Sequence, residues 1–501
     1  MNNKLPLTDL EGTNFKKTNK IIMSRPKIQF PSKASGREEM LDYVSKKKIK
    51  DVDWKKGKAF CLVYHPGEER AKLIKEIYNL YFSDNALNPT ATPSLAELEA
   101  ETVSMCADLF NGDENVRGNI TTGGTESILM AVKTARDWAK KHKPYITKPN
   151  VVLPVSAHPA FMKAFHYFNV DFIPVELGSD FRANPVAMRN AVNKDTIMIV
   201  GSAPSYPHGL MDPIVDIAAI AKEKNIFCHV DACIGGFMLP FVKKLGYPIP
   251  LFDFSVDGVT SISADLHKYG YSSKGSSVIL YKNADIRKFQ FSLYTKWNGG
   301  VYGSPTMTGT RPGGSIAGAW AALKAIGMEG YLEMAKTTMD VTNKIKIAID
   351  AMPELEIIGH PDMSILAFKS NKLDVFKLAD ELNKKGWHFE RQQLPPTLHF
   401  TINYIHRLVA DEFINDLKEC VELAKKFNLE SFTNSLQTKA VKGLSKILPS
   451  GTIAKFQKGS SNSQLKKENT AAMYGMMGAL SGTGDLEEIV LDFLDKIYSV
   501  H

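Results

Sequence analysis

The chain has 501 residues, of which 44% are hydrophobic and 23% charged, a composition typical of a globular protein with a large core. Its net charge of +8 is a mild basic excess that favours an acidic ligand, and no nucleic-acid-binding module accompanies it. Neither a membrane-spanning apolar run nor the apolar core of a signal peptide is found. We therefore expect a soluble, cytoplasmic protein, with export to a host cell as an open alternative.

The cysteines are scattered and form no CxxC pair, so the sequence predicts neither a disulfide framework nor a metal site. A reducing compartment fits this pattern best. The five cysteines are Cys61, Cys106, Cys228, Cys233 and Cys420.

The first part of the chain reads as an arm followed by helices. Residues 1–50 are polar and rich in lysine, and we expect them to be disordered or to order on a partner subunit. A helix is predicted over 69–82. Ser94 and Glu97 form a capping-box pattern that predicts a second helix over 95–110. We divide the chain into an N-terminal arm and helical segment (1–95), a large domain (96–340) and a small domain (341–501).

From residue 118 to about 330, short apolar runs alternate with helical stretches. Buried strands are predicted at 150–155, 196–202, 225–231 and 258–263, and an amphipathic helix over 126–142. Alternation of this kind is typical of an α/β domain with a mostly parallel sheet.

Beyond residue 340 the alternation is looser. The segments 363–370 and 398–404 are predicted strands of a smaller α+β domain. The stretch 431–467 has seven lysines and no acidic residue, which predicts a solvated surface insertion, with contact to a membrane surface as the alternative.

A lysine stands out in SADLHKYG at 263–270, directly after a predicted strand. An amine held at a strand end can form an imine with the aldehyde of pyridoxal phosphate (PLP). Taken alone, Lys268 fits an ordinary surface lysine equally well.

Three further motifs supply other needs of the same cofactor. The glycines of TTGGTES at 121–127 open a helix, whose N-terminus binds phosphate. Asp231 ends a predicted strand and can pair with the protonated pyridine nitrogen, and His158 follows another strand and can stack on the ring. Because all these groups follow strands, we expect them to meet at one edge of a parallel sheet.

Longer motifs carry a resemblance to a known family. They are YFSDNALNP, PSLAELEAETV, NITTGGTESILMA, SAHPAF, GSAPSYPHG, HVDACIGGF, SADLHKYGYSSKGSSV and WNGGVYGSPTMTGTRPGG, with AAMYGMMGAL near the end. The chain resembles the PLP-dependent decarboxylase family of the aspartate-aminotransferase fold type. The resemblance implies PLP transferase fold type I, with a mostly parallel seven-stranded sheet in the large domain and a smaller C-terminal α+β domain.

The resemblance also implies roles for particular residues. Lys268 would carry the cofactor as a Schiff base, His158 would stack on the ring and Asp231 would pair with its nitrogen. The remaining cofactor-binding residues would be Gly123, Gly124, Thr125, Ala232, His267 and Gly309. The segment 303–309 resembles the strip that reaches the partner's cofactor, which implies a homodimer with shared sites.

Within the family, the motifs are most similar to those of the branch that cleaves phosphorylated sphingoid bases. That similarity implies substrate-side roles for Lys274, Tyr64 and Tyr206. Asn88 stands where the family usually has a histidine, and asparagine cannot take up a proton at neutral pH. Rate or substrate preference is therefore in question at this position.

Two alternatives remain open at this point. An amino-acid decarboxylase of the same fold would need a cation for the substrate carboxylate, and Arg311 is the nearest candidate. A non-catalytic protein that keeps PLP and binds anionic lipid through its basic surface would explain the segment 431–467 and Asn88.

Overall fold

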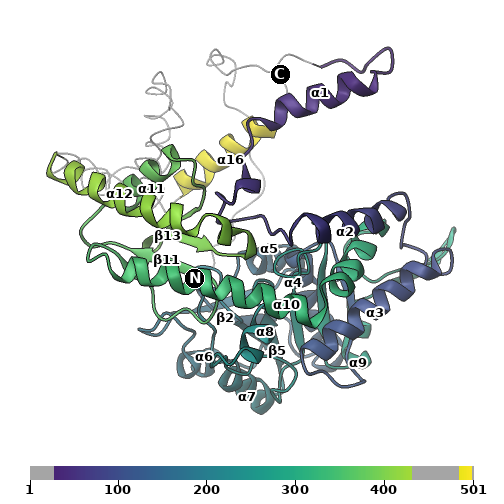
Figure 1. Cartoon of the computed structure of the whole chain (residues 1–501). Helices are drawn as coiled ribbons and strands as arrows, with labels where there is room; N and C mark the ends of the chain where they lie inside the picture. The colour runs from purple at the N-terminus through teal and green to yellow at the C-terminus, as the bar shows by residue number, and fades with distance from the viewer. Residues whose placement is uncertain (1–27, 431–483, 499–501) are drawn as a thin grey trace, which may run out of the picture. The chain divides into compact units, whose positions relative to one another are not determined.

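The computed structural model describes residues 28–430 and 484–498 (Figure 1). Residues 52–430 lie in one compact unit, whereas α1 (Arg37–Lys48) and α16 (Gly484–Tyr498) belong to a second unit. The predicted insertion at 431–467, the AAMYGMMGAL motif and the first 27 residues of the predicted arm lie outside the described residues. Within the described ranges, no helix combines the length and the apolar character needed to cross a bilayer.

The larger core is built on a seven-stranded sheet, as predicted. Its strand order is β1-β7-β6-β5-β4-β2-β3, and only β7 runs antiparallel to its neighbours. The strands are β1 (Arg117–Thr121), β2 (Asn150–Pro154), β3 (Asp171–Val175), β4 (Thr196–Ser202), β5 (Phe227–Asp231), β6 (Ser261–Ala264) and β7 (Ser277–Tyr281).

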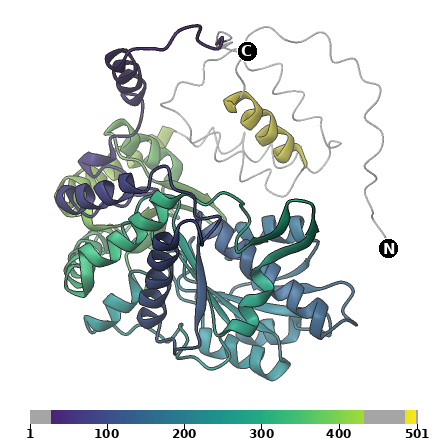
Figure 2. The ribbon, with the colours of Figure 1, turned by 90° about the vertical axis from the view of Figure 1, so that its right-hand side faces the viewer.

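Helices cover both faces of this sheet (Figure 2). Successive residues of a strand point to opposite faces. Val151 and Leu153 therefore pack with α4 and α5, whereas Val152 packs on the face covered by α3, α7, α8 and α10. The helices of this unit are α2 (Glu68–Leu80), α3 (Pro93–Leu109), α4 (Gly124–His142), α5 (Ala160–Phe168), α6 (Pro185–Ala191), α7 (Ile214–Lys224), α8 (Leu239–Lys244), α9 (Ala284–Arg287) and α10 (Gly313–Asp350).

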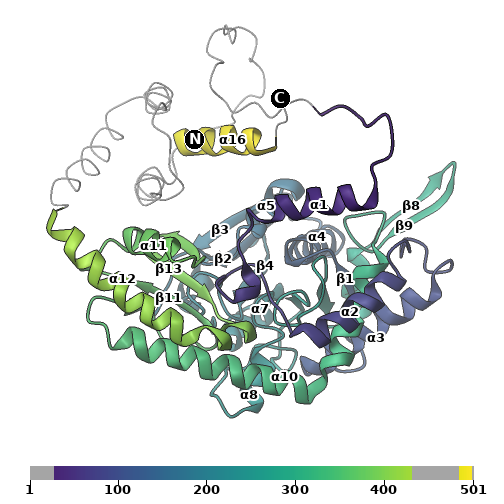
Figure 3. The same cartoon turned by 45° about the horizontal axis from the view of Figure 1, so that its top comes forward.

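A second core surrounds a four-stranded antiparallel sheet with the order β10-β11-β13-β12. Helix α10 joins the two cores and is interrupted at Gly327, where φ is 60° and ψ is 177°, a conformation that glycine adopts at little cost. The elements here are β10 (Glu356–Ile357), β11 (Ile365–Lys369), α11 (Val375–Lys384), β12 (Glu390–Gln393), β13 (Pro396–Thr401) and α12 (Ala410–Glu430). A two-stranded hairpin, β8 (Ser292–Trp297) and β9 (Gly300–Ser304), stands out from the large unit (Figure 3). Short 3₁₀ turns span Trp54–Lys56, Lys288–Gln290 and Tyr404–Leu408.

An N-terminal segment contributes to the small sheet. Ala59 bridges His388, and the backbone N–H of Thr401 donates to the carbonyl of Phe60 over 2.8 Å. The Asn403 side chain donates to the carbonyl of Val63 over 3.0 Å. The residues that lead to Tyr64 are therefore fixed by the C-terminal part of the chain.

The predicted capping box is wrong. Helix α3 begins at Pro93 rather than Leu95, and its N-cap is Thr92, which makes no side-chain capping bond. Proline is pre-organised for the first helical position. Thr92 instead donates its hydroxyl to the carbonyls of Asn85 and Asn88, each over 3.3 Å.

The four predicted strands of the large domain and the two of the small domain are confirmed, although β6 starts three residues later than predicted. In the predicted arm, residues 37–48 form α1, in which no residue is buried.

One buried ion pair ties the large domain together. Both nitrogens of the Arg311 fork donate to Glu99 on α3, with 2.9 Å between Nη1 and Oε2, and both side chains are about nine-tenths buried. Arg311 also donates to the carbonyl of Ile120 over 3.0 Å, and Glu99 accepts from the backbone N–H of Ile120 over 2.8 Å. This pair joins α3, β1 and the start of α10.

We expect Arg311→Met to lower the free energy of unfolding by about 3–5 kcal/mol, because it leaves the Glu99 carboxylate buried without a cation. Urea unfolding checks this. Lys336→Met, which removes only the exposed pair with Asp340, should cost no more than about 0.5 kcal/mol. A loss below about 1 kcal/mol for Arg311→Met would contradict this account, and Glu99→Leu in the same chain should restore most of the stability.

Candidate active site

A cavity of about 520 Å³ opens beside the N-terminus of α4. Its wall combines the predicted phosphate loop, the predicted ring-stacking histidine and the predicted imine-forming lysine. The lining residues are Thr122, Gly123, Gly124, Thr125, Glu126, Ile128, Leu129, His158, Lys163, Tyr167, Cys233, Asp265, His267, Lys268, Met307 and Thr308.

The phosphate loop is held by a buried carboxylate. Glu126, in the first turn of α4, accepts from the backbone N–H and the hydroxyl of Thr122 over 2.6 and 2.7 Å. Its other oxygen accepts from the N–H of Met307 over 2.8 Å. Glu126 thus fixes both the loop and the segment that faces it, while the N-terminus of α4 remains directed at the cavity, where an anion is stabilised.

Glycine at position 124 is required by close packing. A Cβ there would lie 2.8 Å from both carboxylate oxygens of Asp265 and 2.8 Å from the Cys233 sulfur. The floor of the cavity therefore approaches the phosphate loop so closely that no side chain fits between them.

Lys268 is paired with a buried carboxylate. Its Nζ lies 2.9 Å from Oδ2 of Asp265, whose side chain is 2% exposed. Burial lowers the pKa of Lys268, but the charge of Asp265, the hydrogen bond to it and the charge of Asp231 act together in the opposite direction, and the net pKa lies above the usual value. Conversely, burial raises the pKa of Asp265, but Lys268 and His267 lower it more, so that the net pKa is below normal. The pair is charged at neutral pH.

His267 faces the same carboxylate. Its Nδ1 lies 2.7 Å from the carbonyl of Ser276, which can only accept, so Nδ1 carries the proton. Its Nε2 lies 3.6 Å from Asp265. Burial, together with the charges of Lys274 and Lys268, lowers the pKa of His267 despite Asp265.

His158 lines the cavity, and Asp231 lies at the end of β5, two residues before Cys233, which also lines it. Asp231 ends β5 and accepts from the N–H of Cys233 over 3.0 Å, and the next residue, Ala232, donates to the carbonyl of Ser263 over 2.9 Å. His158 follows β2, and its Nδ1 accepts from the N–H of Ala160 over 3.1 Å, which fixes the ring at the cavity wall.

The predicted substrate-side residues gather next to these groups. Lys274 donates to the carbonyl of His267 over 3.1 Å, and its Nζ lies 5.2 Å from the centre of the Tyr64 ring. The Tyr206 ring meets His158 edge to face at 6.5 Å. Burial raises the pKa values of both Tyr64 and Tyr206, so both phenols keep their protons at neutral pH.

Lys274 differs from Lys268 in its electrostatics. Its side chain keeps contact with solvent, yet the atoms packed around Nζ and then the charge of Lys268 lower its pKa to about 8, with Asp265 acting in the opposite direction. Lys274 is therefore the cationic residue of this group that can lose its proton near physiological pH.

Seven of the predicted site residues are not among those that line this cavity: Tyr64, Asn88, Tyr206, Asp231, Ala232, Lys274 and Gly309. Asn88 is exposed, and its side-chain oxygen accepts from the N–H and hydroxyl of Thr90 over 3.0 and 2.7 Å. Gly309 follows Met307 and Thr308, which do line the cavity. The roles predicted for Asn88 and Gly309 stay predictions.

Several residues at the site were not predicted from the sequence. Asp265 lies within the quoted SADLHKYG motif, so an acidic residue three positions before the lysine could have drawn attention to it. Lys163 and Tyr167 lie one helical turn apart on α5, and their spacing was the available signal. The remaining lining residues that were missed are Thr122, Glu126, Ile128, Leu129, Cys233, Met307 and Thr308.

The side chains present fit PLP. A helix N-terminus with a glycine loop supplies phosphate donors, Lys268 supplies a partly buried amine beside a buried carboxylate, and Asp231 lies at the carboxyl end of β5. Arg311 does not face the cavity as a free cation, because Glu99 and Ile120 occupy its guanidinium.

Comparison with family models gives a match over residues 27–371 to the pyridoxal-dependent decarboxylase conserved domain. A sphingosine-1-phosphate lyase from Oryza sativa is 46% identical over 386 residues, which cover 75% of this chain and 71% of the relative. A sphingosine-1-phosphate lyase from Arabidopsis thaliana is 39% identical and covers 97% of this chain and 83% of the relative.

Two solved structures are similar to this chain in fold. A sphingosine-1-phosphate lyase from Burkholderia pseudomallei superimposes with a TM-score of 0.77 at 38% identity, covering 82% of this chain and 96% of that one. A Lactobacillus brevis glutamate decarboxylase superimposes with a TM-score of 0.70 at 21% identity, and the match covers 80% of this chain and 95% of that one. This similarity indicates a shared fold.

Proposed function

The chain belongs to the pyridoxal-dependent decarboxylase family, and on that premise we infer that it is a PLP-dependent lyase acting on sphingosine-1-phosphate. It cleaves the C2–C3 bond to give a long-chain aldehyde and phosphoethanolamine. The observation that carries this inference is the similarity to sphingosine-1-phosphate lyases over most of the chain. The ion pair of Arg311 with Glu99 supports the lyase assignment further. A decarboxylase would need a free cation for the substrate carboxylate, and Arg311 is not free to serve as one.

Lys268 would bind the cofactor aldehyde, and the loop residues Gly123, Gly124 and Thr125 would bind its phosphate. His158 would stack on the pyridine ring, and Asp231 would pair with the ring nitrogen. When bound, PLP supplies a protonated pyridine ring that accepts the electron pair of the breaking bond. Asp265 keeps Lys268 paired and oriented at the cavity floor, since its carboxylate lies 2.9 Å from Nζ.

Cleavage moves one proton from the C3 hydroxyl of the substrate to C2. We assign its removal to the neutral form of Lys274, whose pKa of about 8 suits a proton acceptor at neutral pH. The same amine can return the proton to C2. Tyr64 and Tyr206 keep their protons and would donate hydrogen bonds to the developing aldehyde oxygen or to the substrate phosphate.

A homodimer with shared sites is also proposed. All six residues of β8 are exposed, and the hairpin carries Leu293, Trp297 and Val301 at 67%, 57% and 73% exposure. Apolar exposure on a protruding hairpin is typical of a surface that packs against another subunit. The hairpin leads directly to Met307 and Thr308 at the cavity, so a partner seated on it would lie beside the site.

We place the enzyme in a reducing compartment, either the cytoplasm of its own cell or that of a host. The five cysteines support this, since each is a buried free thiol.

PLP-loaded protein incubated with sphingosine-1-phosphate should release a long-chain aldehyde and phosphoethanolamine, both measured by mass spectrometry. Lys268→Ala should reduce release to the uncatalysed background, whereas the exposed lysine variant Lys282→Ala should match the parent. Carbon dioxide from amino acids, with no aldehyde from sphingosine-1-phosphate, would overturn the lyase assignment in favour of the decarboxylase.

The pH dependence of kcat should show the titration of Lys274. Since the neutral amine is the active form and its pKa is lowered to about 8, the rate should rise with pH around a midpoint near 8. Lys274→Gln should remove this limb and lower kcat by about 10²–10⁴-fold. A higher KM with unchanged kcat and an intact limb would show instead that Lys274 binds the substrate phosphate.

Light scattering should give twice the chain mass of 55.6 kDa. Trp297→Ser combined with Val301→Ser should shift the protein toward the monomer, because both side chains lie on the exposed hairpin. Val186→Ser, at an equally exposed apolar position on α6, is the matched control. A dimer that persists unchanged in the hairpin variant would place the interface elsewhere.

A further inference from the structure

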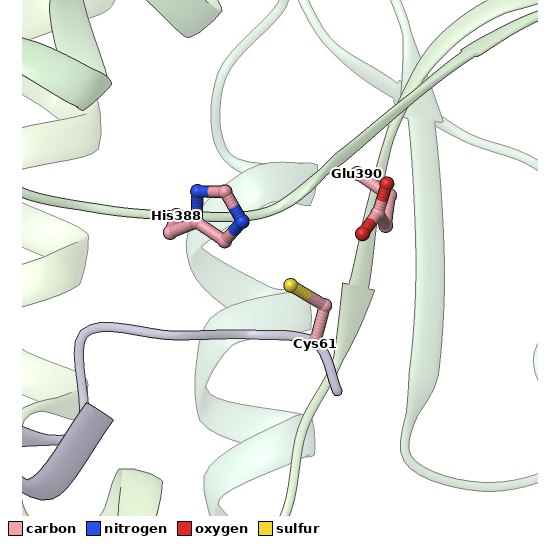
Figure 4. Close-up of side chains that lie close together, drawn as sticks. All are labelled: Cys61, His388 and Glu390. Carbon is pink, nitrogen blue, oxygen red and sulfur yellow. The ribbon is translucent and has the colours of Figure 1, made fainter. Parts of the chain in front are cut away.

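A second group of chemically reactive side chains lies beside the substrate-side tyrosines. It consists of Cys61, His388 and Glu390, whose sulfur, ring nitrogen and carboxylate oxygen all lie within 4.8 Å of one another. Figure 4 shows the three side chains directed toward a common space, Cys61 from the N-terminal segment and the other two from the segment that leads into β12. The sequence predicted no metal site, because the cysteines are scattered and form no CxxC pair, and Cys61 is more than 300 residues from His388 and Glu390.

The backbone around this group is fixed from both sides. His388 accepts from the N–H of Phe60 and donates to the carbonyl of Lys58, each over 2.8 Å. Glu390 pairs with His399 in the antiparallel ladder between β12 and β13. The ligand-bearing segments are thus held by hydrogen bonds that do not involve the three side chains, so the group is pre-positioned.

We propose that Cys61, His388 and Glu390 bind one Zn²⁺ ion. Thiolate, imidazole and carboxylate are the three ligand types that zinc takes in proteins, and three protein ligands leave a fourth position for water or a substrate group. Zinc–ligand bonds of about 2.0–2.3 Å require the three atoms to close on the ion by roughly 1 Å. His388 and Glu390 are only partly buried, which leaves the ion a way in from solvent.

Metal binding would change the protonation of this group. Burial, followed by the charge of Glu390 and a hydrogen bond to it, raises the pKa of the Cys61 thiol to about 12. A divalent cation would reverse this, because a coordinated thiol loses its proton. Zinc binding would therefore release one proton and neutralise the charge of Glu390.

The ion would lie next to the active site. Burial and then the charge of Glu390 raise the pKa of Tyr206, and Cys61 lies three residues before Tyr64 in the chain. Zinc would join the segment that carries Tyr64 to the small sheet and place a positive charge beside both phenols. This inference does not depend on the lyase assignment, since it concerns metal binding alone.

The test is equilibrium dialysis of tag-free, PLP-loaded full-length protein against buffered Zn²⁺, with bound metal measured by mass spectrometry. The parent should hold one equivalent per chain. Cys61→Ala and Glu390→Gln should each bind at least tenfold more weakly. Cys106→Ala, which removes a buried thiol with no carboxylate among the groups that act on it, should bind like the parent.

Substitution of Co²⁺ gives an independent readout that needs no variant. The parent should show a thiolate-to-cobalt charge-transfer band, and this band should be absent from Cys61→Ala. A parent that binds no more zinc than Cys61→Ala, or that binds cobalt without this band, would overturn the proposal. Retained PLP absorbance in each variant establishes that a loss of metal is not a loss of fold.

Discussion

The buried ion pair between Lys268 and Asp265 is the interaction around which the site is organised. A carboxylate that is 2% exposed stays charged only beside a cation, and here the cation is the amine that the cofactor requires. The position of Asp265 also constrains the residues around it. Gly124 must lack a side chain because Asp265 lies against it, and His267 is turned so that its protonated nitrogen faces Ser276 rather than the carboxylate.

Substrate choice in this fold depends on which cations remain available at the cavity. Arg311 is committed to Glu99 and to the carbonyl of Ile120, where it stabilises the junction of α3, β1 and α10. Lys268 forms an ion pair with Asp265 and would bind the cofactor. Lys274, with its lowered pKa, is the more adaptable cation. Because Arg311 is bound to Glu99, the cation expected for an amino-acid carboxylate is not free, whereas a phosphorylated sphingoid base has no carboxylate to bind.

Much of the fold was predictable from the sequence because buried parallel strands are short apolar runs, and two of them, β4 and β5, end in the polar residues Ser202 and Asp231. The hairpin β8–β9 escaped prediction because its strands are exposed and lack that apolar signature. Within the site, motifs identified Lys268, His158 and Asp231. Side chains that act through contacts with another segment were missed: one oxygen of Glu126 holds Thr122 in its own loop, but the other accepts from the N–H of Met307, which is 181 residues away in the chain.

The segment that carries Tyr64 is built into the small sheet through Ala59, Phe60 and Val63. Their partners, from His388 to Asn403, emerge from the ribosome hundreds of residues later. The large core can therefore form around the cofactor cavity while its substrate-facing tyrosine is still without its support, since domains tend to fold as units during synthesis. In the order of synthesis, the residues that line the cofactor cavity are therefore complete before the residues that support Tyr64.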